Sequence, residues 1–226
     1  MRYPNIHRAV FISRPNRFVA HCELDGAPIT VHVKNTGRCR ELLVPGAEVW
    51  LTKSDNPDRK TAFDLIAVQK GPRLVNMDAQ APNAVFGEYV RAGHFLPDTR
   101  SVRAEVRYGD SRFDFCVQTG DATHYVEVKG VTLEENGAVR FPDAPTERGV
   151  KHLKELQKAA REGHGAHAVF VIQMAHVTAF SPNDDTHPAF GAALREAAQN
   201  GVQVHAFWCD VTPDTMHIAG EVPVKL

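Results

Sequence analysis

The sequence has few of the features that mark secreted or membrane proteins. Only four of its 226 residues are cysteine, and no two of them form a CxxC pair. Such scattered cysteines argue against a disulfide framework and predict reduced thiols. No apolar run reaches the roughly 20 residues of a membrane-spanning helix, and the first residues lack the apolar stretch of a signal peptide. We therefore expect a cytoplasmic protein without a membrane partner.

Several common catalytic signatures are also missing. The chain contains no GxGxxG motif, no P-loop and no evident Ser-His-Asp set. His164, His167 and His176 lie close together in sequence, but their spacing matches no common zinc template and no cysteine is near them. The sequence therefore gives no support for binding of a dinucleotide, a nucleoside triphosphate or zinc.

Charge is distributed unevenly, although the total net charge is only −1. Residues 1–80 contain 12 Lys and Arg against 8 Asp and Glu, whereas residues 81–226 contain 14 against 19. A basic first part is suited to a polyanion, and an acidic second part is suited to metal ions. The alternative is a chance distribution of solvated surface charge.

The first part, residues 1–80, has the pattern of a small all-β domain. Short β-rich runs at 17–24, 29–34, 47–53 and 61–70 are separated by turn residues, and 35–43 predicts a brief helix. About five strands with one small helix suit a closed barrel such as an OB-fold, with a sandwich as the alternative. Its best basic cluster is a candidate nucleic-acid-binding surface and comprises Arg17, Lys34, Arg38 and Arg40.

The second part, residues 81–226, has a pattern of both helices and strands, unlike the all-β first part. A helix is expected over 84–95 with Asn83 as its N-cap, followed by three antiparallel strands at 101–108, 112–118 and 124–131. Helical and apolar strand patterns then alternate to the end of the chain. The expected fold is a mixed sheet flanked by helices, so the whole chain combines an α+β and an α/β organisation in two domains.

Charged residues interrupt two of these strands. Asp114 stands between Phe113 and Phe115, which alternation places together on the opposite face. On the next strand Glu127 and Lys129 share one face, so Asp114 can converge with them if the strands are neighbours. The alternative for an isolated Glu-x-Lys is a solvent-facing ion pair. An aspartate on an adjacent strand favours a site, because ionised groups rarely lie within a sheet without partners.

Two adjacent carboxylates imply a cation. They raise each other's pKa unless a positive charge offsets the repulsion, and Mg²⁺ or Mn²⁺ prefers such oxygen ligands. Asp114 and Glu127 are therefore the expected metal ligands. Lys129 would orient an attacking water or offset charge in the transition state, so that all three are catalytic candidates for phosphodiester hydrolysis.

The pattern Asp114…Glu127-Val128-Lys129 resembles the signature of the PD-(D/E)xK nuclease superfamily. The wider chain resembles the sugar fermentation stimulation protein family, through stretches that extend from about residue 17 to 190. The stretches that carry this resemblance are HVKNTGRCRELLVPGAEVWL, VNMDAQAPN, SRFDF, YVEVKGVTL, FPDAPTERGVKHLKEL and FSPNDDTHPAF.

The resemblance implies an N-terminal OB-like domain and a C-terminal PD-(D/E)xK domain. It also implies non-specific binding of nucleic acid, DNA in preference to RNA, and a link to the regulation of sugar (maltose) metabolism. In the superfamily a polar helix after the Glu-x-Lys strand lines the site, which makes Arg148 and His152 candidates for phosphate contact. A solvated helix face is the alternative for these two residues.

Two functions remain open from the sequence. The first is a divalent-metal nuclease that holds nucleic acid with its barrel, and the intact set of Asp114, Glu127 and Lys129 favours it. The second is a non-catalytic, non-specific DNA-binding regulator of sugar metabolism whose nuclease-like domain is a scaffold. A third, an enzyme that acts directly on sugars, would require a pocket with paired carboxylates.

Overall fold

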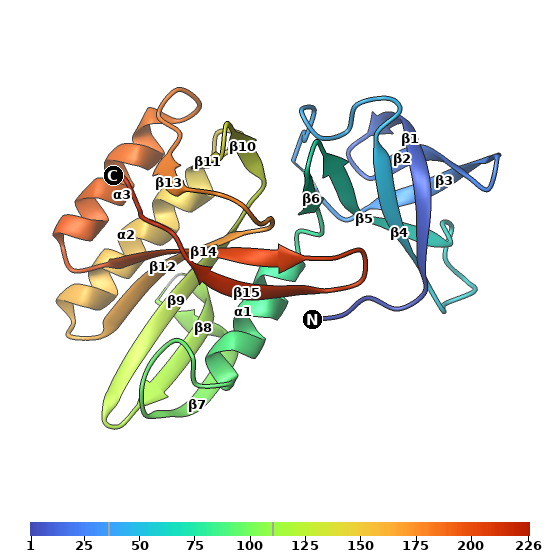
Figure 1. Ribbon diagram of the computed structural model, residues 1–226. Coiled ribbons are helices and arrows are strands. Elements are labelled where there is room, and N and C mark those ends of the chain that lie inside the picture. Colours follow the sequence, from blue (N-terminus) through green and yellow to red (C-terminus); the bar gives the residue numbers. More distant parts are fainter. Residues whose placement is uncertain (36, 110) are drawn as a thin grey trace.

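The computed structural model describes residues 1–35, 37–109 and 111–226. Within them the chain forms a barrel from its first part and a helix-flanked sheet from its second part (Figure 1). The barrel lies at the right of the figure, and the two parts meet near β6 and the start of α1. None of the helices in these residues is long and apolar enough to cross a membrane.

The first sheet closes on itself. Its strand order is β3-β2-β1-β4-β5-β6, and a parallel pairing of β3 with β5 joins His32 to Asp64 and Val33 to Leu65. This closure confirms the OB-like barrel and excludes a sandwich. The strands are β1 (Ile6–Asn16), β2 (Val19–Leu24), β3 (Ala27–Val33), β4 (Glu48–Lys53), β5 (Phe63–Lys70) and β6 (Arg73–Asn76).

Two local features of the barrel differ from the sequence prediction. The long strand β1 was not predicted, because its outward-facing residues include Val10 and Ile12, which obscure the alternation. The helix expected within 35–43 is a set of turns, because Cys39 has a positive φ of 44° that no helix allows. Buried Leu42 anchors this segment to the core. Residue 36 of that prediction lies outside the described residues.

The second sheet is mixed, as predicted. Its order is β15-β14-β12-β9-β8-β7; β9, β12 and β14 run parallel, and the remaining neighbours run antiparallel. Its strands are β7 (Thr99–Tyr108), β8 (Ser111–Thr119), β9 (Ala122–Val131), β12 (Gly165–Ile172), β14 (Gln203–Val211) and β15 (Met216–Glu221). A small further sheet of β10 (Leu133–Glu135), β11 (Ala138–Phe141) and β13 (Ala179–Pro182) was not predicted.

Helices cover both faces of this sheet. The apolar residues of α1 (Ala81–Arg91) pack on one face, and those of α2 (Glu147–Arg161) and α3 (Pro188–Gln199) pack on the other. The Thr146 hydroxyl caps α2 by accepting a hydrogen bond from the Gly149 amide at 3.1 Å, as its sequence predicts. Helix α1 begins earlier than expected, because Pro82 occupies its first turn and moves the N-cap to Gln80.

The junction between the two parts, at residues 78–83, is held by buried side chains and hydrogen bonds. Ala81 and Pro82 are buried in α1, and the preceding Asp78 is 1 % exposed. The Asp78 carboxylate accepts a hydrogen bond from the Gln80 amide at 2.9 Å and pairs with the Lys34 ammonium at 2.6 Å. Ala79 and Gln80 are exposed, but buried residues lie on both sides of them and their amides donate to Lys34 O and Asp78 Oδ1, so we expect this junction to resist proteolysis.

A buried carboxylate also ties the barrel to the small sheet. Glu134 of β10 is 3 % exposed, and its carboxylate pairs with Lys70 Nζ at 2.8 Å and Arg73 Nη1 at 3.4 Å. Burial raises the pKa of Glu134, but hydrogen bonds from Lys70 and the Gly137 amide and the charges of Lys70 and Arg73 bring the net pKa below its ordinary value. The carboxylate is therefore ionised and holds the β5–β6 hairpin in place.

We predict that Glu134→Gln lowers the free energy of unfolding by about 1–3 kcal/mol at pH 7, because two half-buried cations lose their charged partner. Glu135→Gln is the matched control, since that neighbouring side chain is 64 % exposed, and should change stability by less than about 0.5 kcal/mol. Urea denaturation followed by circular dichroism measures both.

The difference between wild type and Glu134→Gln should depend on pH. A lowered folded pKa means that the carboxylate stabilises the protein fully above its unfolded pKa, about 4.3, and loses that effect as pH falls through the folded pKa. The two proteins should therefore converge as pH falls below the ordinary range of a glutamate and through the lowered folded pKa. Equal denaturation midpoints at pH 7 would contradict the role of Glu134.

Candidate active site

Strand β8 is irregular at Asp114. Phe113 packs on Tyr125 with ring centroids 5.4 Å apart in the cluster that contains α2, whereas Phe115 packs on Phe86 of α1 at 5.4 Å. The two phenylalanines thus lie on opposite faces, and the prediction that they share one face is wrong. Opposite Asp114 on β7, Glu105 has a positive φ of 57°, which disturbs the regular pleat.

This irregularity brings the Asp114 carboxylate to the junction of three elements. Its Oδ1 accepts a hydrogen bond from Asn83 Nδ2 of α1 at 2.8 Å, and its Oδ2 accepts one from the Val128 amide of β9 at 2.7 Å. Burial, followed by the charge of Glu127, raises the pKa of Asp114 above its ordinary value. Asp114 and Glu127 therefore lie close enough to repel each other, as the sequence predicts.

Glu127 has one occupied and one free carboxylate oxygen. Oε1 accepts hydrogen bonds from Lys129 Nζ at 2.5 Å and from His152 Nδ1. Oε2 is buried and has no hydrogen-bond partner among the described residues. Burial raises the pKa of Glu127, but His152 and Lys129 outweigh it and bring the net pKa below its ordinary value. Glu127 is thus ionised and presents one uncompensated oxygen.

The carboxylate oxygens of Asp114 and Glu127 are suitable ligands for a hard divalent cation. A buried carboxylate oxygen without a partner is costly, and a cation between Glu127 and Asp114 would compensate both that oxygen and the mutual repulsion. No group of three or more His, Cys, Asp or Glu side chains in the described residues forms a preformed metal site. Two carboxylates are nevertheless what Mg²⁺ commonly takes from a protein, with water and substrate oxygens as the other ligands.

Helix α2 places His152 and Arg148 beside Glu127. His152 is 6 % exposed, and Arg148, one turn earlier, donates from Nε to His152 Nε2 at 3.4 Å. Since His152 Nε2 accepts, its Nδ1 proton faces Glu127, which fixes the tautomer through the hydrogen-bond network. Both residues predicted from the polar helix face are therefore at the site. His152 contacts the carboxylate, while Arg148 is exposed on the first turn of the helix.

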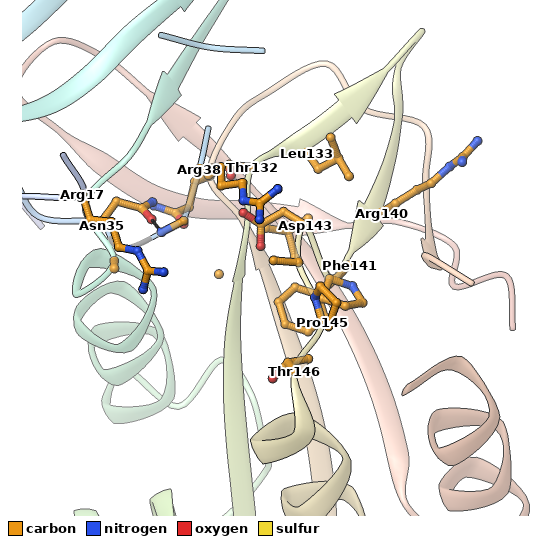
Figure 2. A pocket seen from close by; sticks show the side chains of 17 residues that line it. Arg17, Asn35, Arg38, Thr132, Leu133, Arg140, Phe141, Asp143, Pro145 and Thr146 are labelled. Carbon is orange, nitrogen blue, oxygen red and sulfur yellow. Dashed lines mark hydrogen bonds between the residues drawn. The ribbon is translucent and has the colours of Figure 1, made fainter. Parts of the chain in front are cut away.

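A pocket of about 580 Å³ opens between the barrel and the second sheet, and we call it the interdomain pocket (Figure 2). Strand β9 enters its wall directly after Lys129, and Thr146 at the start of α2 forms another part of the wall. The elements that carry Glu127 and His152 thus both lead to this pocket. Its other lining residues are Arg17, Asn35, Gly37, Arg38, Ala79, Gly130, Val131, Thr132, Leu133, Arg140, Phe141, Pro142, Asp143, Ala144, Pro145 and Gln173.

The predicted basic residues of the barrel differ in where they lie. Arg17 and Arg38 line the interdomain pocket and reach toward it from the barrel side, and neither guanidinium has a partner among the described residues (Figure 2). Arg40 lines an adjoining groove on the barrel. Lys34 departs from the prediction: its ion pair with buried Asp78 at 2.6 Å supports the junction, so we leave it out of the phosphate contacts.

Arg14, which sequence reasoning missed, holds the two arginine-bearing segments together. Its guanidinium donates four hydrogen bonds of 2.6 to 2.8 Å to backbone carbonyls of residues 17, 35, 37 and 38. No local sequence signal distinguishes this arginine, because its partners are backbone atoms of two separate loops. Arg14 is thus a positioning residue for Arg17 and Arg38.

Asn83 and Gln173 were also missed as parts of the site. Asn83 was expected to cap a helix, yet its amide binds Asp114; Pro82 is the signal that could have moved the cap upstream. Gln173 packs so closely on Gly130 that an added Cβ there would lie 2.6 Å from Gln173 Oε1. Its amide donates to the carbonyls of Asn76 and Asp78 at 3.1 Å. The barrel is thus fixed at the end of β9.

Comparison with known proteins identifies the chain. The family model described as SfsA N-terminal OB domain matches residues 12–77, and the model described as Sugar fermentation stimulation protein RE domain matches residues 80–215. The chain belongs to the sugar fermentation stimulation protein family. Its relatives include sugar fermentation stimulation protein homologs of Clostridium beijerinckii and Ruminiclostridium cellulolyticum, each 52% identical over 226 residues and covering 100% of both chains.

A solved structure shares the whole fold. The structure of Pyrococcus furiosus SfsA in complex with Ca²⁺ matches with a TM-score of 0.90 at 27% identity, and the match covers 100% of this chain and 98% of that one. The family resemblance and the two-domain fold expected from the sequence are thereby confirmed.

Proposed function

We propose that this sugar fermentation stimulation protein is a divalent-metal-dependent nuclease that hydrolyses phosphodiester bonds in DNA. The observation that carries the proposal is the buried, unpartnered Glu127 Oε2 beside Asp114, a carboxyl whose pKa is raised in part by Glu127 itself. A scaffold without chemistry has no evident need for two repelling buried carboxylates.

Asp114 and Glu127 would hold the cation. Mg²⁺ and Mn²⁺ are the ions whose preference for carboxylate oxygens fits this pair, and the SfsA of Pyrococcus furiosus forms a complex with the related hard cation Ca²⁺. When bound, such an ion lowers the pKa of a coordinated water and neutralises charge on a phosphoryl oxygen.

The surrounding residues have separate roles in this proposal. The Lys129 ammonium, 2.5 Å from Glu127, is positioned to hold an attacking water and to offset negative charge that develops on the phosphate. His152 orients the Glu127 carboxylate from the other side. Arg148, Arg17, Arg38 and Arg40 would bind phosphates of the strand on either side of the cleaved bond.

The second candidate is a non-catalytic, non-specific DNA-binding regulator of sugar (maltose) metabolism. The unpartnered guanidinium groups of Arg17 and Arg38 on the barrel favour it, because they can bind phosphate without any metal. Both candidates act in the cytoplasm, which is consistent with the four buried, unpaired cysteines.

The metal site is tested with Asp114→Asn. We predict that this change removes the binding of Mn²⁺ or Mg²⁺, because one of the two charged ligands is lost. The fold should persist, since asparagine has the same shape and Asn83 can turn its amide to accept the new N–H. Isothermal titration calorimetry measures the loss, and Asp121→Asn, an exposed aspartate on the β8–β9 turn, is the matched control. Equal heats from wild type and Asp114→Asn would refute the metal site.

A change at Lys129 tests catalysis separately from metal binding. We predict that Lys129→Ala keeps metal binding but lowers the rate of DNA cleavage by about 10²–10³-fold or more, because its charge acts on the transition state. Lys60→Ala, at an exposed position on the barrel, should cleave at the wild-type rate. A gel assay with labelled DNA in Mn²⁺ measures both. Metal binding by wild type without cleavage of any DNA form would favour the regulator instead.

DNA binding should depend steeply on salt. Neutralised phosphates release counterions, so the logarithm of affinity falls linearly with the logarithm of salt concentration. We predict that Arg38→Ala and Arg40→Ala each reduce this slope by about one and weaken binding equally for unrelated sequences. Arg195→Ala on α3, which pairs with Asp184 away from the barrel, should leave the slope unchanged. A flat salt dependence, measured by fluorescence anisotropy, would contradict phosphate binding.

A further inference from the structure

The interdomain pocket continues onto the barrel. A groove of about 460 Å³, which we call the barrel groove, shares Arg17, Gly37 and Arg38 with the pocket. It extends from there past Ile12 to Arg40. The two hollows therefore form one track that leads from the barrel surface to Gly130 on β9, the residue that follows Lys129 in the chain.

The size of the pocket selects what can enter it. The interdomain pocket has a volume of about 580 Å³. Such a volume is typical of sites that enclose one small organic ligand. A single unpaired nucleotide is a ligand of that size class, whereas a duplex with two stacked strands is much larger.

The lining of the track matches the parts of a nucleotide. Arg17 and Arg38 supply unpartnered guanidinium groups for phosphate at the shared section (Figure 2). Phe141 and Pro142 supply apolar wall on the far side. Asp143 supplies a carboxylate that can meet a base edge, whereas the Asn35 amide is engaged with the backbone of Met77 and Gly37. Arg140 also lines the pocket, but its side chain points away from it.

The barrel surface next to the track combines positive charge with exposed apolar groups. Ile12 lines the barrel groove and is 41 % exposed. Phe18, which follows Arg17 in the chain, is 55 % exposed. An exposed aromatic ring beside arginines is the combination on which unpaired bases stack. A duplex keeps its bases inside the stack and would gain nothing from these groups.

We propose that the substrate is single-stranded DNA, and that an unpaired nucleotide next to the cleaved phosphate occupies the interdomain pocket. This inference rests on the proposed function and narrows its substrate. The strand follows the barrel groove, turns at Arg17 and Arg38, and presents its backbone to Lys129 and the carboxylate pair. Arg14 keeps the turn in shape through its four backbone hydrogen bonds.

The test compares a labelled 12-nucleotide oligo-dT with a blunt hairpin duplex, by anisotropy in EDTA and by cleavage in Mn²⁺. We expect the single strand to bind at least tenfold more tightly than the duplex and to be cut in preference. Ala79→Trp fills the pocket from an exposed lining position while keeping every arginine, and it should abolish this preference. Ala122→Trp, exposed at the opposite end of β9, is the matched control and should behave as wild type.

Arg17→Glu is a second variant, for the case that Ala79→Trp unfolds in a thermal melt. It should lower single-strand affinity at least tenfold and duplex affinity much less. Equal binding and cutting of both DNA forms, unaffected by either variant, would overturn the inference and leave the nuclease proposal intact. Single-strand binding that both variants weaken, without any cleavage, would support the pocket and overturn the nuclease proposal.

Discussion

The second half of the molecule is organised around one constraint. Two carboxylates, those of Asp114 and Glu127, lie close together in a buried site and repel each other. Asp114 and Glu127 are close enough for the charge of Glu127 to raise the pKa of Asp114. Each is held by different elements: Asp114 by α1 and the backbone of β9, Glu127 by α2 and by Lys129 on its own strand. Helices on both faces of the sheet are therefore needed to fix a single pair of side chains.

The protein compensates the two charges unequally. Both oxygens of Asp114 accept hydrogen bonds, whereas Glu127 has two donors on one oxygen and none among the described residues on the other. The Glu127 oxygen without a donor keeps its negative charge, so a cation is attracted to that side of the carboxylate. A fully paired site would be more stable but would have no remaining affinity for metal, which is the usual conflict between stability and function.

The position of the barrel matters as much as the site itself. Gln173 and the ion pairs of Glu134 fix the barrel at the end of β9, where Gly130 permits close approach. Arg17 and Arg38 consequently stand at the rim of a pocket whose opposite wall carries the start of α2. Neither half of the chain contains this pocket alone, so the residues proposed to bind phosphate and those proposed for catalysis depend on the junction for their relative position.

The sequence by itself determined the candidate site residues and most of the fold. Turn residues and apolar periodicity predicted an OB-like barrel followed by a mixed sheet with helices, because these signals are local. The spacing of Asp114, Glu127 and Lys129 on neighbouring strands predicted a carboxylate pair with a lysine, and the polar face of one helix predicted His152 and Arg148. Family resemblance supported the same assignment over most of the chain.

Only the tertiary structure decided how these residues are held and what they face. The irregularity at Asp114 separates Phe113 from Phe115, and strand alternation cannot reveal it because it depends on the neighbouring strand at Glu105. In sequence Lys34 looked equivalent to Arg38, but its ammonium pairs with the buried carboxylate of Asp78, 44 residues away. Arg14 and the interdomain pocket depend on backbone atoms and surfaces from distant segments. Local sequence patterns cannot predict the role of Arg14 or the pocket, because only packing brings those segments together.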